Sequence, residues 1–154
     1  MQSPPKKELR YKRLWQIRLL AVSIAVSLSG PTAAAELIVS VFGVVGDRGT
    51  VGCALYSGKG GFPMDPSSVP NLRLPADPEG VQCTYPNLTP GTYAVAVSQD
   101  FNGNEITDTN VFGIPKEPWG VSNNVRPTLR PPRIEEAQFT LEASETRHIT
   151  IELE

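Results

Sequence analysis

The chain has 154 residues, of which 14 are Lys or Arg, 16 are Asp or Glu, two are Cys and one is His. Its formal charge of −2 excludes a strongly basic protein that binds nucleic acid through charge alone. The length suits one domain preceded by a short targeting segment.

The N-terminal residues have the pattern of an export signal. Ala33 and Ala35 form an A-x-A cleavage pattern after an apolar run at 19–28, and six basic residues precede or begin that run: Lys6, Lys7, Arg10, Lys12, Arg13 and Arg18. The run is about half the roughly 20 residues that a membrane span needs. The pattern predicts a signal peptide at 1–35, no membrane span after cleavage, and a location in the periplasm or outside the cell.

The remaining residues, 36–154, are acidic. Residues 1–35 hold six of the 14 basic side chains and one of the 16 acidic ones, so 36–154 carry eight basic and fifteen acidic groups, a charge of −7. A charge of this sign makes nucleic acid and anionic membranes unlikely partners on physical grounds. Residues 36–154 are therefore expected to form one domain with one core.

Apolar and polar residues alternate with a period of two along most of 36–154, which indicates β-strands. No helical period lasts for three turns. Proline and glycine turns separate the predicted strands, which are 37–42, 50–56, 72–74, 80–85, 93–99, 137–142 and 147–153. The sequence thus predicts an all-β, immunoglobulin-like Greek-key sandwich of about seven strands with one long ordered loop at 100–135.

Cys53 and Cys83 lie in two of these predicted strands. Alternation places Cys53 with Val51 and Leu55, and Cys83 with Val81 and Tyr85, so both sulfurs point into the core. In an oxidising compartment two such thiols are expected to form a disulfide. Closing this loop would stabilise the fold by about 3.5 kcal/mol. Two free buried thiols are the alternative.

The start of the long loop has the spacing of a calcium-binding loop. Asp100, Asn102, Asn104 and Asp108 stand at the first, third, fifth and ninth positions, and the Ile106 carbonyl would be the backbone ligand. This predicts a weak calcium site that orders the loop. The alternative is that the Asp and Asn side chains form turns by bonding their own backbone.

Linked motifs give a family resemblance. They are Leu88-x-Pro90-Gly91-x-Tyr93, the Asp100-x-Asn102-x-Asn104 spacing, Phe112-Gly113-Ile114-Pro115 with Glu117, and Gly120-x-Ser122-Asn123-Asn124. With the Gly61-Phe62-Pro63 turn and the stretch from Pro131-Pro132 to Phe139, the chain resembles the domain-of-unknown-function family 2141, small exported bacterial proteins. The resemblance implies a secreted or periplasmic β-sandwich, transthyretin-like in shape, and it implies no known activity.

Two positions depart from the calcium-loop pattern. Glu105 stands at the sixth position, where relatives commonly have Gly and where a sharp turn prefers Gly. Val111 occupies the twelfth position, where a bidentate Glu would bind. A helix-flanked calcium hand is therefore not expected, and a looser oxygen-lined site is the form that remains.

A second group of candidate ligand-binding residues follows in the loop: Trp119, Asn123, Asn124 and Arg126. Trp119 could stack on a sugar or pin the loop to the sandwich. The two amides and the guanidinium could bind a polyol or carboxylate, or could bond loop carbonyls.

Enzymatic activity is not expected. His148 alternates with inward-facing Ile149 and Ile151, and with the Cys pair bonded it has no partner for a nucleophilic or zinc site. Glu105, Asp108 and Glu117 could form a paired-carboxylate site, but nothing in the sequence indicates burial that would shift their pKa. The expected function is a non-catalytic module that binds an envelope protein or glycan, or supports an assembly, through 100–135. The alternative is a carbohydrate-binding or carbohydrate-processing envelope protein.

Overall fold

A computed structural model describes residues 34–58, 60–111 and 114–154. The predicted signal peptide lies outside these residues except for its last two positions. Ala35, predicted as the last residue of the signal, is the first residue of a strand and is 2% exposed. Within the described ranges no helix is long and apolar enough to cross a membrane.

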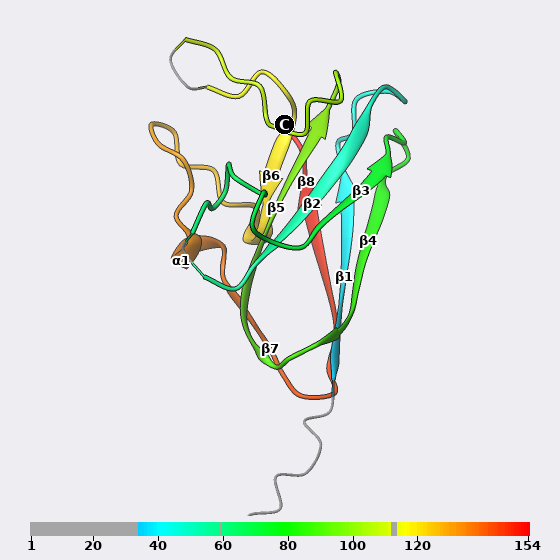
Figure 1. Cartoon of the computed structure of the whole chain (residues 1–154), viewed down its shortest axis with the longest axis vertical. Helices are drawn as coiled ribbons and strands as arrows, with labels where there is room; N and C mark the ends of the chain where they lie inside the picture. Colours follow the sequence, from blue (N-terminus) through cyan, green and yellow to red (C-terminus); the bar gives the residue numbers. More distant parts are fainter. Residues whose placement is uncertain (1–33, 59, 112–113) are drawn as a thin grey trace, which may run out of the picture.

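Two β-sheets pack face to face (Figure 1). One has three strands in the order β4-β1-β8, and the other has the order β3-β2-β5-β6 with β7 also paired to β5. The strands are β1 (Ala35–Phe42), β2 (Thr50–Tyr56), β3 (Asn71–Pro75), β4 (Val81–Leu88), β5 (Gly91–Asp100), β6 (Trp119–Val121), β7 (Phe139–Leu141) and β8 (Thr146–Glu152). The predicted all-β sandwich is confirmed.

Strand β1 shows how the alternating pattern sets the register. Its inward residues Leu37, Val39 and Val41 are fully buried, while the residues between them are partly exposed. β1 pairs antiparallel with β4 and parallel with β8, so that Val39 lies between Cys83 and Ile149. A one-residue slip would turn this apolar set toward solvent, which is why the register is well specified.

The predicted disulfide is present. Cys53 of β2 and Cys83 of β4 are bonded, and neither residue is exposed to solvent. The bond therefore joins the two sheets through the centre of the core. Beside it, the Tyr85 hydroxyl donates to the Cys53 carbonyl at 2.5 Å, so the buried phenol has the partner that burial requires.

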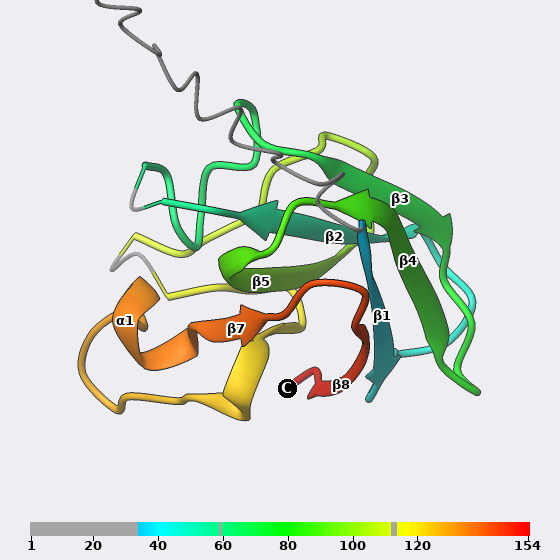
Figure 2. The same cartoon turned by 90° about the horizontal axis from the view of Figure 1, so that it is seen from below.

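The predicted loop at 100–135 contains more regular structure than the sequence indicates. Strand β6 pairs with β5, a 3-10 turn η1 (Ser122–Asn124) follows it, and helix α1 (Ile134–Ala137) begins just before the predicted loop ends. Figure 2 shows α1 next to β7. The three residues of β6 are too few to show alternation, and their partner strand ends nineteen positions earlier in sequence.

A second apolar cluster covers the outer face of the five-stranded sheet. It unites Ala54 and Tyr56 of β2 with Ala94 and Ala96 of β5 and with residues of the two long connections, namely Phe62, Val69, Trp119, Val121, Val125, Ile134 and Ala137. Strands β2 and β5 are therefore buried on both faces. Except for Tyr56, their outer residues are small because the connections lie directly on the sheet.

Candidate functional site

Asp100 is the centre of the turn that begins the 100–117 connection. It is 2% exposed. Its Oδ1 accepts the backbone N–H groups of Asn102 at 3.2 Å and Gly103 at 2.7 Å. Its Oδ2 accepts the N–H of Glu105 at 2.8 Å and the Arg73 guanidinium at 3.2 Å. Burial alone would raise the pKa of Asp100, but these hydrogen bonds and the Arg73 charge hold that pKa below its ordinary value.

The next two predicted ligands also form turns. Asn102 Oδ1 accepts the N–H of Asn104, and Asn104 Oδ1 accepts the N–H of Ile106, each at 3.0 Å. Their amide nitrogens both donate to the Asp108 carboxylate, at 2.8 and 2.9 Å. All five residues predicted to bind calcium thus belong to one turn assembly, which we define as residues 100–108.

The contacts of this assembly are those of a hydrogen-bonded turn. Calcium needs six to eight oxygen ligands, whereas the groups that face Asp108 are two N–H₂ donors. Rotating either amide to present oxygen would place its nitrogen against a backbone N–H and break the turn. In the described parts of the chain, no group of three or more His, Cys, Asp or Glu could hold a metal. These contacts favour the turn interpretation of the acidic residues.

Glu105 adopts the backbone conformation that the sixth position of such a loop requires. Its φ is 67°, in the left-handed region where Gly is favoured and other residues are strained. The hydrogen bond from its N–H to Asp100 and that from Arg73 Nη2 to its carbonyl, at 2.8 Å, hold it there. Val111, at the twelfth position, is 94% exposed. The loop therefore keeps its tight turn without Gly.

Glu117 closes the base of the connection, a role that the sequence did not reveal. It is 5% exposed, and its two carboxylate oxygens accept the N–H groups of Phe101 and Asp108, each at 2.9 Å. Lys116 N–H also donates to the Asp108 carbonyl at 2.8 Å. The Glu117 carboxylate thus holds the end of the connection to the segment in which it begins.

The second predicted group is tied to the fold by its polar atoms. The Arg126 guanidinium lies 5.6 Å from the centre of the Trp119 ring and donates to the Trp119 carbonyl at 3.3 Å. It also donates to the Glu152 carbonyl and pairs with Glu154 at 3.3 Å. Arg126 therefore holds β6 to the last residues of the chain. These contacts match the alternative in which the guanidinium bonds backbone carbonyls instead of a ligand.

Asn123 and Asn124 both have left-handed backbone conformations, with φ of 63° and 49°, which Asn tolerates better than most residues. The Asn123 amide donates to the carbonyls of Glu136 and Gln138, both at 3.1 Å. The Asn124 side chain bonds both the Thr150 carbonyl and the Glu152 N–H. Their amides bond the backbone rather than a surface group.

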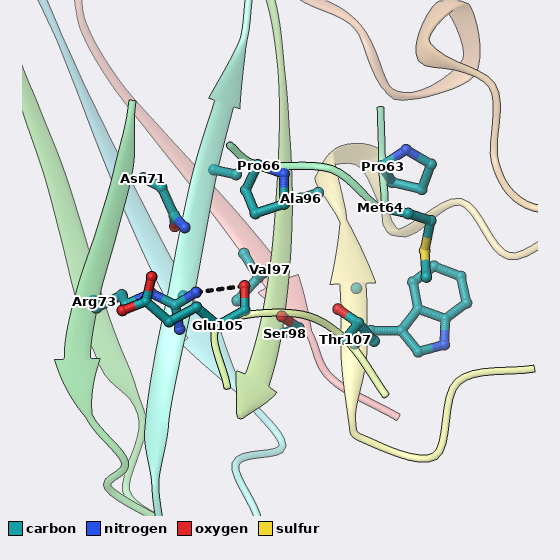
Figure 3. Close-up of a pocket in the computed structure, with 14 residues that line it drawn as sticks. Pro63, Met64, Pro66, Asn71, Arg73, Ala96, Val97, Ser98, Glu105 and Thr107 are labelled. Atoms are coloured by element: carbon teal, nitrogen blue, oxygen red, sulfur yellow. Dashed lines mark hydrogen bonds and ion pairs between the residues drawn. The ribbon is translucent and has the colours of Figure 1, made fainter. Parts of the chain in front are cut away.

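A groove lies on the outer face of the five-stranded sheet between residues 61–70 and the turn assembly (Figure 3). Its narrow inner part is a cavity of about 30 Å³ over β2 and β5, and it adjoins an open part of about 740 Å³. Residues shared by both parts are Met64, Pro66, Asn71, Arg73 and Glu105. Of the residues singled out in the sequence, Glu105 and Trp119 line the inner part and Glu105 and Ile106 line the outer part.

No pattern in the sequence indicates that the other residues of this groove come together. Asn71 and Arg73 come from edge strand β3, Met64 from an irregular turn, and Gly52 from the centre of β2. They meet only because β3 pairs with β2 and because the two connections fold over the same face of the sheet.

The model of a bacterial family described as uncharacterized conserved proteins (DUF2141) matches residues 39–149. The chain belongs to this family. The DUF2141 match includes the disulfide, the turn assembly and every groove residue named above. Neither a curated protein nor a solved structure matches the chain.

Membership of DUF2141 attaches no activity to the groove or to the turn assembly, because the family description names none. His148, which the sequence placed on the solvent face of the last strand, is exposed there on the sheet that does not carry the groove. We therefore take the groove and the adjoining turn assembly as the candidate binding surface.

Proposed function

We propose that the chain is an exported, non-catalytic binding module whose ligand or partner contacts the groove wall formed by the turn assembly. The observation that carries the proposal is the way in which residues 100–108 are held. Asp100 alone accepts four hydrogen bonds there, one of them from Arg73 on the neighbouring strand. A loop this well fastened loses little entropy when it binds.

Export is supported by the disulfide and by the N-terminal pattern. A bond such as Cys53–Cys83 persists in oxidising compartments and is rare in the cytosol of most bacteria. The basic and apolar residues of 1–33 supply the expected signal, although they lie outside the described residues.

A non-catalytic role is supported by how the carboxylates of this region are used. Asp100 and Glu117 are buried and accept backbone N–H groups, and Asp108 accepts two side-chain amides. The pKa of Asp100 is held below its ordinary value, which suits a general acid poorly. These carboxylates hold the loop in place, and the groove surface beside them contacts the ligand or partner.

The test uses two exposed positions on opposite sheets. Ile106, 58% exposed, lies on the groove side, and exposed His148 lies on the three-stranded sheet. The full chain, purified after export and immobilised, is presented with separated protein and polysaccharide fractions of the cell envelope. Ile106→Asp should abolish retention of the bound component, and His148→Asp should leave it unchanged. Equal retention by all three chains, or none by the wild type, would refute the proposal.

A further inference from the structure

The groove contains a buried acceptor that the fold leaves without a partner. The side-chain Oδ1 of Asn71 is buried and has no hydrogen-bond partner among the described residues. Asn71 is one of the residues that line the 30 Å³ cavity, which has room for about one or two water-sized groups. Leaving such an acceptor unsatisfied costs about 1 to 3 kcal/mol. The position therefore calls for a donor supplied from the groove.

The neighbouring charge decides what kind of donor fits. A Cβ atom built on Gly52 would lie 3.5 Å from Asn71 Oδ1 and 3.8 Å from Arg73 Nη1, so the acceptor and the guanidinium lie over the same part of the floor. Arg73 is already bonded to Asp100 and to the Glu105 carbonyl. An ammonium group in this narrow cavity would lose its hydration and would stand beside a like charge that Asp100 already balances. A neutral hydroxyl donates to Asn71 without that cost.

The remaining surface of the groove combines carbon and hydroxyl groups. Met64, Pro66 and Ala96 supply apolar surface, and Ser98 and Thr107 supply hydroxyls. Figure 3 shows Asn71 and Arg73 at one side of the inner part, with Met64 and Thr107 across the sheet from them. The Glu105 carboxylate is mainly exposed at the rim and can accept further hydroxyls.

We propose that the groove binds a neutral saccharide, with one hydroxyl donating to Asn71 Oδ1 in the inner cavity and the carbon face of the ring against Met64 and Pro66. This rests on the proposed function, because the turn assembly forms the opposite wall. Saccharides carry hydroxyl donors at their edges and C–H groups on their faces, which is the combination that this lining requires. The inner cavity accepts a single hydroxyl-sized group, and the open part holds the rest of the sugar.

Two variants separate recognition from folding. Gly52→Ala adds a methyl group to the floor at an ordinary contact distance of 3.5 Å, so it narrows the cavity without a clash. Asn71→Leu removes the acceptor at similar volume, and stability should stay equal or rise because an unsatisfied buried group is lost. Gly58→Ala is the control, since no atom lies within 4 Å of its Cβ position and it does not line the groove.

The measurement is tryptophan fluorescence of the protein purified after export, in which Trp119 is the sole tryptophan once the predicted signal with Trp15 is removed. The probes are maltohexaose, cellohexaose and N-acetylchitohexaose, with trilysine as the cationic comparison. At least one hexasaccharide should bind saturably and trilysine should not. Gly52→Ala and Asn71→Leu should weaken binding at least tenfold with unchanged melting temperature, while Gly58→Ala should bind like the parent chain.

Three results would overturn this inference. They are no binding of any hexasaccharide at millimolar concentration, binding of trilysine in preference to sugars, and saccharide binding unaffected by Gly52→Ala and Asn71→Leu. The failure of the broader proposal is distinct. If Ile106→Asp abolishes retention of an envelope component but Gly52→Ala and Asn71→Leu do not, the proposed binding module is supported and the proposed saccharide site is refuted.

Discussion

The outer faces of the two sheets differ in what covers them. On the three-stranded sheet the outward residues of β4 and β8 are polar and exposed, among them Gln82, Thr84, His148 and Thr150. On the five-stranded sheet the outward positions of β2 and β5 are mostly Gly, Ala and Ser, with Tyr56 as the large exception, and two long connections lie on them. A sheet face of small residues is thus a sign of an added layer of chain, and the groove lies where that layer is incomplete.

The largest effect is expected where the two sheets are joined. In Cys53→Ala/Cys83→Ala, the loss of the disulfide should lower the free energy of unfolding by about 3.5 kcal/mol, because the unfolded chain regains the entropy of a 30-residue loop. Urea unfolding of the variant, with the wild type measured with and without a reducing agent, checks this. A loss below about 1 kcal/mol would show that packing alone holds the sheets together.

A direct comparison of the two faces uses one substitution on each. Ala94 is fully buried beneath the connections, so Ala94→Leu should overpack that layer and cost about 1 to 3 kcal/mol. Thr84→Leu on the open face should change stability by no more than about 0.5 kcal/mol. Urea unfolding measures both, and equal costs would contradict the description of a covered and an uncovered face.

The fastening of the turn assembly to the covered sheet should depend on pH. The pKa of Asp100 is lowered in the folded state, so its stabilisation is present above the unfolded-state pKa of about 3.9 and is lost as the pH falls through the folded-state pKa. Asp100→Asn should therefore be less stable than the wild type by about 1 kcal/mol at pH 7.

The same variant should differ little from the wild type once the pH is below the folded-state pKa of Asp100, where a protonated Asp resembles Asn. Urea unfolding across this range supplies the test. A stability difference that stays constant from pH 7 down to the acid unfolding of the wild type would show that the charge of Asp100 is not what fastens the loop.

The smallest effect is expected from calcium. Because amide nitrogens face Asp108, millimolar calcium should leave the melting temperature where excess EDTA leaves it. Magnesium serves as the control for ionic strength. A calcium-specific rise that Asp100→Ala/Asp108→Ala removes would instead establish a metal site in the turn assembly.

The parts of the fold that could be predicted are those in which one face of a strand is buried. Leu37, Val39 and Val41 alternate with partly exposed residues, so their strand and its inward face follow from the sequence. The same alternation directed both cysteines inward and gave the disulfide. Strand β6 could not be predicted, because three residues are too few to show an alternation of apolar and polar side chains and because its pairing with β5 joins residues far apart in sequence.

The candidate site divides in the same way. The turn assembly is local in sequence, so the spacing of Asp100, Asn102 and Asn104 identified its members, although a spacing cannot say whether amide oxygen or nitrogen faces the centre. The groove is assembled from separate segments. Nothing next to Asn71 in sequence indicates that its carbonyl is buried without a partner over Gly52.

The pairing of the first strand with the last has a consequence for the order of folding. β8 lies beside β1 in parallel, with Glu36 opposite Thr146, so the three-stranded sheet cannot close until nearly the whole chain is present. Contacts of such large sequence separation slow folding, since the intervening chain must be ordered first. A chain built in this way completes its three-stranded sheet only after its last strand is available to pair with its first.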